Sequence, residues 1–451
     1  MEKDTRLTIP EPEITLYQDG FDKHDKLSRK PTGDKLSELV ERIDDPLVIA
    51  LDGAWGSGKS FFLKCWVGEH LKREKNTTQT VYFDAFKHDF LDDPLIALTG
   101  AIAERFEEAD DKPAQKAWKK AKQVAPALGR ALVRTGVSVA TAGLVTKADA
   151  LTDAAINTVS SELDGAVAEF WQRENGKRAA MAAFRQALID LTEPNNDGYP
   201  TRKLIVVIDE LDRCRPDFSL CLLEVTKHFF SVDGVHFVLG VNLSELQNSV
   251  RARYSENSDA EKYLQKFTSV TLPLSGAKVR QGEIGVYSKY YEHISEQYNF
   301  DNDWRYDWIR NYLLMIDHHT SVSLRDIEKL ISQVIVSPEP ETASEGTFHI
   351  YSGLSVLRII KPNLIKDARF NRLEYKNVDE VFRLSGRDAE PGFFRDAKIS
   401  WSACTLGQGD NLRSSPSSDH LDRLEIRKNR ATLPARVIAE CFDTFILPNG
   451  S

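Results

Sequence analysis

The stretch from residue 47 to residue 64 constrains the fold of this chain more than any other. An apolar run, Leu47 to Leu51, is followed by a loop with three glycines and then by a second apolar run, Phe61 to Leu63. The loop matches the pattern G-x-x-x-x-G-K-[ST], which binds phosphate groups when a strand precedes it and a helix follows it. The two apolar runs supply that strand and that helix. We therefore predict a strand, a phosphate-binding loop and a helix start, in this order.

The residue types in the loop suit a bound phosphate group. A backbone that turns its N–H groups inward around an anion needs glycine wherever a side chain would block the approach. Lys59 can place its ammonium group against the terminal phosphates, and Ser60 can give its hydroxyl group to Mg²⁺. The positive end of the helix dipole also faces the anion. The predicted nucleotide-binding residues are Gly53, Ala54, Trp55, Gly56, Ser57, Gly58, Lys59, Ser60 and Phe61.

A further apolar run ends in two acids. Residues 203–208 are rich in Val and Ile, and Asp209 and Glu210 follow directly. Such a run is typical of a strand buried on both faces, and its carboxyl end lies at the sheet edge where α/β proteins bind ligands. Beside a phosphate-binding loop, Asp209 would hold Mg²⁺ together with Ser60, and Glu210 would orient or deprotonate the attacking water. The alternative is a surface turn that merely follows a core strand.

Three more runs, 80–84, 235–241 and 267–274, have the composition of strands and alternate with predicted helices. This alternation predicts an α/β fold with a doubly wound, mainly parallel sheet. Asn242 follows the second of these runs, so its side chain would lie at the same sheet edge as Asp209, in reach of the γ-phosphate or the water. A simple turn asparagine is the alternative.

At 451 residues the chain is too long for one compact core. We expect a nucleotide-binding core over residues 1–275, with an alanine-rich helical insertion at about 107–178. A helical lid over residues 276–338 would follow, and then a C-terminal region, 339–451, whose fold the pattern does not specify and which could bind a partner. The insertion holds an uncharged run, 135–146, which is shorter than the roughly 20 residues of a membrane span. We therefore predict no full span, with peripheral membrane contact as the alternative.

Net charge and cysteine usage bear on the binding partners and the cellular location to be expected. The net charge of −9 gives no overall field that would favour DNA or anionic lipid. The five cysteines are scattered without a C-x-x-C pair, which fits reduced thiols in a cytoplasm. The N-terminus lacks the basic and apolar regions of a signal peptide. A cytoplasmic location is expected.

Four stretches, in this order, resemble the KAP family of P-loop NTPases: Gly53-Ala54-Trp55-Gly56-Ser57-Gly58-Lys59-Ser60, Phe83-Asp84-Ala85-Phe86-Lys87-His88 before Asp93-Pro94-Leu95, Ile208-Asp209-Glu210-Leu211-Asp212-Arg213, and Lys262-Tyr263-Leu264-Gln265-Lys266-Phe267. The resemblance covers about residues 20–335. It implies ATP hydrolysis with Mg²⁺, an insertion before the acidic strand, and a lid with an R-D-I motif like Arg325-Asp326-Ile327. Many members carry transmembrane helices in the insertion, and this chain departs from them there. Similar proteins often have aspartate where Asn242 stands and tryptophan where Phe86 stands.

The leading hypothesis is an ATPase switch in which an arginine completes the transition state. Arg213 and Arg325 are the candidates, although Arg213 could instead pair with a nearby acid and Arg325 could be solvated. The arginine can also come from a second subunit, so a homo-oligomer is expected to be relevant. Prokaryotic relatives are often found in anti-phage systems, which implies a sensor or regulator beside a protein effector.

Two alternatives stay open. The first is an ATP-binding scaffold that recruits partners with negligible turnover, although the presence of Glu210 favours the enzyme. The second is a nucleic-acid-stimulated ATPase that uses the lysines of the insertion, although the acidic total charge argues against it. Those lysines are Lys112, Lys116, Lys119, Lys120 and Lys122.

Overall fold

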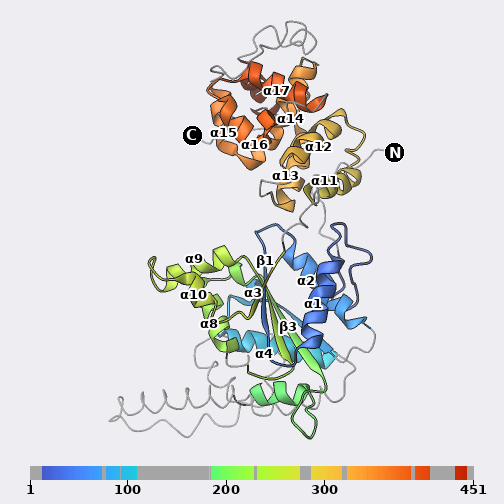
Figure 1. Ribbon diagram of the computed structural model, residues 1–451, viewed down its shortest axis with the longest axis vertical. Helices are drawn as coiled ribbons and strands as arrows, with labels where there is room; N and C mark the ends of the chain where they lie inside the picture. The colour runs from blue at the N-terminus through green and yellow to red at the C-terminus, as the bar shows by residue number, and fades with distance from the viewer. Residues whose placement is uncertain are drawn as a thin grey trace, which may run out of the picture.

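Five apolar segments form one sheet in the order β2-β3-β4-β1-β5, and every neighbouring pair is parallel (Figure 1). The strands are β1 (Val48–Asp52), β2 (Thr78–Asp84), β3 (Lys203–Asp209), β4 (Val235–Val241) and β5 (Val270–Pro273). The computed structural model describes residues 13–73, 78–91, 93–108, 182, 184–227, 231–274, 286–316, 322–342, 344–386, 392–406 and 432–443. The predicted α/β fold with a parallel sheet is confirmed.

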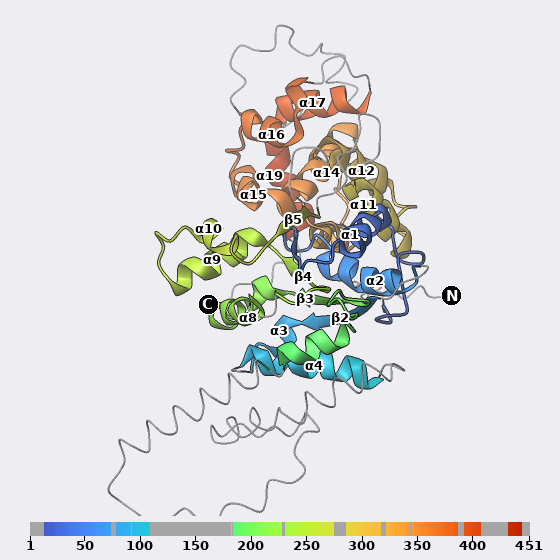
Figure 2. The same cartoon turned by 60° about the horizontal axis from the view of Figure 1, so that its bottom comes forward.

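Helices cover both faces of the sheet, which explains why its central strands are predominantly apolar. On one face, α1 (Lys30–Arg42) and α2 (Lys59–Leu71) share a hydrophobic cluster with Ile49 and Val207. On the other, α4 (Pro94–Glu108), α8 (Pro216–Lys227), α9 (Leu243–Arg253) and α10 (Ala260–Leu264) pack against Ala50 and Val206. Figure 2 shows α2 and α4 on opposite sides of the strands. Side chains that alternate along each strand therefore enter two different cores.

Strand order decides where the loop and the acids lie. The phosphate-binding loop follows β1, Asp209 ends β3 with Glu210 directly after it, and β4 lies between these two strands. In the register of the sheet, Gly240 of β4 is opposite both Leu51 and Asp209. The carboxyl ends of all three strands therefore meet at one edge. The short elements α3 (Ala85–His88) and η1 (Leu211–Arg213) follow β2 and β3 at this edge.

The second part of the chain is helical (Figure 1). Its elements are α11 (Val286–Gln297), α12 (Trp304–Ile316), α13 (Leu324–Val336), α14 (Glu345–Ile360), α15 (Pro362–Arg369), α16 (Tyr375–Phe382), η2 (Leu384–Gly386), α17 (Phe393–Cys404), α19 (Leu433–Val437) and η4 (Ile438–Phe442). One hydrophobic cluster joins them, from Tyr291 to Phe442. Helix α14 is buried along most of its length and contacts α12, α13, α15, α17 and α19. The residues of the expected lid and those of the expected C-terminal region therefore share a core, which does not divide at residue 338.

Several expectations concern residues outside those that the structure describes. They include residues 109–178 of the insertion, with its five lysines and its uncharged run. Within the described part of the chain, no helix is long and apolar enough to cross a membrane.

Candidate functional site

The loop between β1 and α2 has a backbone that requires glycine at two positions. Gly56 has φ +74° and Gly58 has φ +82°, both in the left-handed region that other residues rarely adopt. Neighbours also approach closely: a Cβ atom on Gly56 would lie 2.8 Å from the side chain of Ser323, and one on Gly58 would lie 2.9 Å from Nη1 of Arg29. The glycines of the sequence pattern are thus explained by both conformation and contact.

Polar atoms of the loop are available to an anion. Ser57 lines the cavity at the loop, and its hydroxyl oxygen is buried with no hydrogen-bond partner among the described residues. Lys59 is buried, and Nζ donates to the carbonyl oxygens of Gly53 at 2.5 Å and Ala54 at 3.3 Å. Burial lowers the pKa of the Lys59 ammonium group, while the carboxylates of Asp212, Asp209 and Asp52 oppose that shift. An orphaned hydroxyl and a buried cation in a glycine cradle fit the phosphates of a nucleotide.

The end of the loop meets the acids of β3. The hydroxyl group of Ser60 donates to Oε1 of Glu210 at 3.0 Å, although the two residues are far apart in the sequence. Asp209 is fully buried; its Oδ2 accepts from the hydroxyl group of Tyr82 at 2.6 Å and its Oδ1 from the backbone N–H of Glu210 at 2.9 Å. Burial raises the pKa of Asp209 to about 6, against the lowering effect of the hydrogen bonds from Tyr82 and Ser60. The two predicted metal ligands, Ser60 and Asp209, are therefore direct neighbours.

This donor set fits Mg²⁺ in particular. One carboxylate and one hydroxyl group are enough for an ion that keeps several waters and takes substrate phosphate oxygens. A protein-only metal site would need more ligands, and the described residues contain no group of three or more His, Cys, Asp or Glu side chains that could hold a metal ion.

A small residue on β4 permits this meeting across the strand. A Cβ atom on Gly240 would lie 2.4 Å from Oδ1 of Asp209 and 2.6 Å from Cδ1 of Leu63 on α2. Both distances are far below ordinary van der Waals contact, so no other residue fits without moving them. Because Gly240 has no side chain, α2 and Asp209 can approach each other over this position of β4.

The second acid is held in a strained conformation. Glu210 has φ +58°, which is uncommon for a residue with a side chain, and η1 begins directly after it. Its Oε2 forms an ion pair with Nη1 of Arg213 at 2.7 Å. Of the two roles considered for Arg213, the structure therefore contains the pairing with a nearby acid, and that acid is the predicted catalytic one.

The three residues of the R-D-I motif have different surroundings in the structure. Asp326 and Ser323 form a capping box that starts α13, and Ile327 enters the hydrophobic core. Arg325 is exposed and lines the cavity, and no hydrogen bond or ion pair joins it to another described residue. The backbone N–H of Leu324 donates to the carbonyl oxygen of Gly56 at 2.9 Å. The start of α13 is thus attached to the loop, with a free arginine beside it.

Three predicted residues lie apart from the cavity. Asn242 precedes α9 and does not line the cavity, although the next residue, Leu243, donates its N–H to Oδ1 of Asp52 at 2.9 Å. The indole N–H of Trp55 donates to Oδ2 of Asp212 at 2.6 Å, and the ring is 48% exposed. Gly53 also stays outside the lining.

The cavity has a volume of about 1450 Å³ and extends from the loop and the acids to α11 and α13. The rest of its wall consists of residues of β2, α3 and α4 and of the N-terminal segment, which we define as residues 13–29. Tyr17, His24 and Arg29 of this segment line the cavity. Sequence reasoning missed Tyr82, Gly240 and Arg29. Nothing in the local pattern distinguishes them, because each acts through a contact with a residue distant in the sequence.

One of three comparisons with known proteins agrees with this geometry. Residues 29–338 match the model of the KAP family P-loop domain. No curated protein matches the chain. Among solved structures, the ORC2 protein of Aeropyrum pernix, determined in ADPNP–ADP complexes, aligns over 92% of this chain and 94% of that chain, with 13% identity and a TM-score of 0.33. That score is too low for the likeness to carry an argument about this chain.

Proposed function

The chain belongs to the KAP family of P-loop NTPases, and on this premise we propose that it hydrolyses ATP with Mg²⁺ in the cavity between the loop and the acids. The observation that carries the proposal is the hydrogen bond between Ser60 and Glu210. It joins the end of the phosphate-binding loop to the acidic strand across β4, so that the residues needed for phosphoryl transfer surround one space.

The loop residues would bind and orient the triphosphate. The backbone N–H groups from Gly56 to Ser60 and the ammonium group of Lys59 would replace their present contacts by contacts with phosphate oxygens. Ser60 and Asp209 would hold Mg²⁺, which neutralises part of the charge on the phosphates. Because Asp209 is fully buried and fixed by Tyr82, its carboxylate keeps one orientation towards the loop.

Glu210 would position the attacking water and accept its proton. In the structure its carboxylate is engaged by Ser60 and Arg213. Once Ser60 turns to the metal, one oxygen of Glu210 becomes available to water. Arg213 would then keep the carboxylate in place, and Arg325 would contribute positive charge at the γ-phosphate.

Attachment of α13 to the loop supports a role as a nucleotide-driven switch. A change at Gly56 reaches the helical part through the backbone of Leu324. A regulatory role in anti-phage defence beside a protein effector, and action as a homo-oligomer, are proposed from the family resemblance alone.

One observation favours the ATP-binding scaffold as a second candidate. Ser60 and Arg213 together engage both carboxylate oxygens of Glu210, so a chain in which Ser60 never leaves this carboxylate would bind ATP without turnover. The nucleic-acid-stimulated ATPase has no such support, because its lysines lie outside the described residues.

Steady-state phosphate release with two variants tests the proposal. Glu210→Gln should keep ATP binding and lower turnover by about 10²-fold or more, since it removes the proton acceptor. Lys59→Ala should abolish nucleotide binding in calorimetry. Wild-type turnover in Glu210→Gln would refute the role of Glu210, and undetectable turnover in the wild-type chain with intact ATP binding would favour the scaffold.

A further inference from the structure

Arg29 is a buried cation at the wall of the cavity. It directly precedes α1, is 8% exposed and lines the cavity beside Gly58 of the loop. Its Nη1 atom lies 3.5 Å from the carbonyl oxygen of Gly58, at the limit of a hydrogen bond. Among the described residues this is the one hydrogen bond that its guanidinium group makes.

The charge of Asp25 acts on this group, but the carboxylate forms no hydrogen bond with the guanidinium group. Oδ1 of Asp25 accepts from the backbone N–H of Arg29 at 2.7 Å, and Oδ2 accepts from that of Lys30 at 2.8 Å. Burial lowers the pKa of Arg29 to about 10, and the charge of Asp25 only partly opposes this. The guanidinium group remains protonated at neutral pH, with most of its five N–H donors unused. A buried charge in this state is unfavourable unless an anion joins it.

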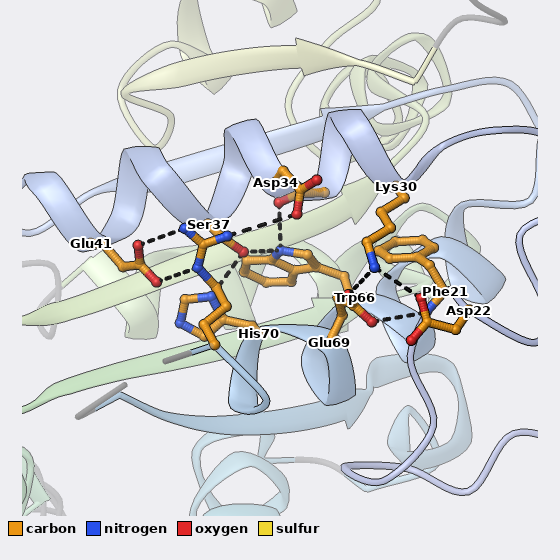
Figure 3. A network of polar contacts seen from close by, with 11 residues as sticks. Phe21, Asp22, Lys30, Asp34, Ser37, Glu41, Trp66, Glu69 and His70 are labelled. Atoms are coloured by element: carbon orange, nitrogen blue, oxygen red, sulfur yellow. Dashed lines mark hydrogen bonds and ion pairs between the residues drawn. The ribbon is translucent and has the colours of Figure 1, made fainter. Parts of the chain in front are cut away.

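Contacts around α1 fix the position of Arg29. Figure 3 shows the neighbouring Lys30 between two acids, with Nζ 2.9 Å from Asp22 and 2.7 Å from Glu69 of α2. The same Glu69 accepts from the backbone N–H of Phe21 at 3.2 Å. The N-terminal segment is therefore attached to α2 near the C-terminal end of that helix. The guanidinium group itself extends to the other end of α2, where Nη1 contacts Gly58 of the loop before any ligand arrives.

We propose that Arg29 is a phosphate-binding residue, supplied to the nucleotide site by the N-terminal segment. Its ligand is a nucleoside di- or triphosphate, and the inference rests on the proposed function of the same site. The backbone of a phosphate-binding loop cradles the α- and β-phosphates. A cation beside Gly58 therefore reaches oxygens that ADP and ATP share, in contrast to Arg325, which is assigned to the γ-phosphate.

The test measures nucleotide affinity and nucleotide-free stability in the same variants. Arg29→Met should raise the Kd of MgADP and of MgATP by about 10- to 100-fold in calorimetry, because it removes charge-assisted hydrogen bonds. Its melting temperature without nucleotide should equal or exceed that of the wild type, since an uncompensated buried charge is gone. The increase in melting temperature on addition of MgADP should shrink accordingly.

Two more variants complete the design. Arg29→Gln keeps a polar side chain but loses the charge, and it should weaken nucleotide binding even if Arg29→Met fails to fold. Arg73→Met is the control, because Arg73 lies after the far end of α2, is already paired with Glu41 at 2.6 Å and does not line the cavity. It should leave both Kd values unchanged.

Wild-type affinity in Arg29→Gln would overturn the assignment. So would a lower nucleotide-free melting temperature in Arg29→Met with unchanged Kd values, since that pair of results describes a structural arginine. If the wild-type chain binds neither MgADP nor MgATP, the proposed function fails as well. Intact binding by the wild type with intact binding by the Arg29 variants would overturn the role of Arg29 alone.

Discussion

Replacing Gly240 by alanine should inactivate the site while leaving the fold in place. The added Cβ atom would lie 2.4 Å from Oδ1 of Asp209 and 2.6 Å from Cδ1 of Leu63, whereas an ordinary contact begins at 3.4 Å. Neither neighbour can yield freely. Asp209 is fixed by Tyr82 and by the backbone N–H of Glu210, and Leu63 is fully buried in the core under α2.

The size of the effect follows from these distances. Relief of the contact requires a displacement of about 1 Å, shared between Asp209 and α2. A misplacement of that size in a catalytic group lowers turnover by about 10²-fold. Overpacking of the core should lower the free energy of unfolding by about 1–3 kcal/mol, a loss that a folded chain of this size can tolerate. Gly240 has no positive φ, so alanine adds no backbone strain.

The assay is steady-state phosphate release as a function of ATP and Mg²⁺, with circular dichroism on the same preparation. We expect kcat to fall and the Mg²⁺ requirement to rise. Gly100→Ala is the matched control, because a Cβ atom on Gly100 of α4 would meet nothing within 4 Å. It should keep wild-type turnover and stabilise the helix by up to about 1 kcal/mol. Wild-type kcat and Mg²⁺ dependence in Gly240→Ala would refute the assignment of Asp209.

Three other predictions concern neighbouring features. Tyr82→Phe removes the hydrogen bond that lowers the pKa of Asp209, so the acidic limb of the pH–rate profile should move to higher pH; an unchanged profile would contradict this. Arg325→Ala should reduce kcat by about 10³-fold or more and leave the Kd of ADP unchanged, and a parallel loss of ADP affinity would place Arg325 elsewhere. Burial lowers the pKa of His70 to about 4 from an ordinary 6.5, so the stability that neutral His70 provides is present above pH 6.5 and is lost as the pH falls towards 4. Denaturant unfolding at pH 7 and pH 5 should show a fall in the free energy of unfolding to which His70 contributes on the order of 2 kcal/mol, and His70→Gln should make that slope shallower.

Local sequence pattern identified the parts of the site that are contiguous in the chain. The glycine loop, the strand before it and the acids at the end of β3 each follow from residue types at short spacing. Ser60 ends the loop that follows β1, and Glu210 directly follows β3. Because the carboxyl ends of parallel strands lie at one edge of the sheet, this edge brings the two residues together. The loop, the strand and the acids were predictable because each depends on neighbours in the sequence.

The remaining features depend on contacts between distant residues. Gly240 reads as an ordinary glycine in a strand, and only the approach of Asp209 and Leu63 gives it a role. Tyr82 reads as a strand residue, and only the pairing of β2 with β3 brings it to Asp209. Likewise, no single helix after residue 338 has a pattern that reveals a core shared with α11 to α13.

That shared core has a mechanical consequence. From Tyr291 to Phe442 the helical part is held together by one set of packed side chains, and its α13 is attached to Gly56 by a backbone hydrogen bond. Closely packed interiors resist deformation. A small displacement at the loop would therefore rotate the helical part as a rigid body and would not bend one helix alone. The widest movement would then occur at the surface most remote from the loop, which is where a molecule that senses the state of the nucleotide has the largest signal to detect.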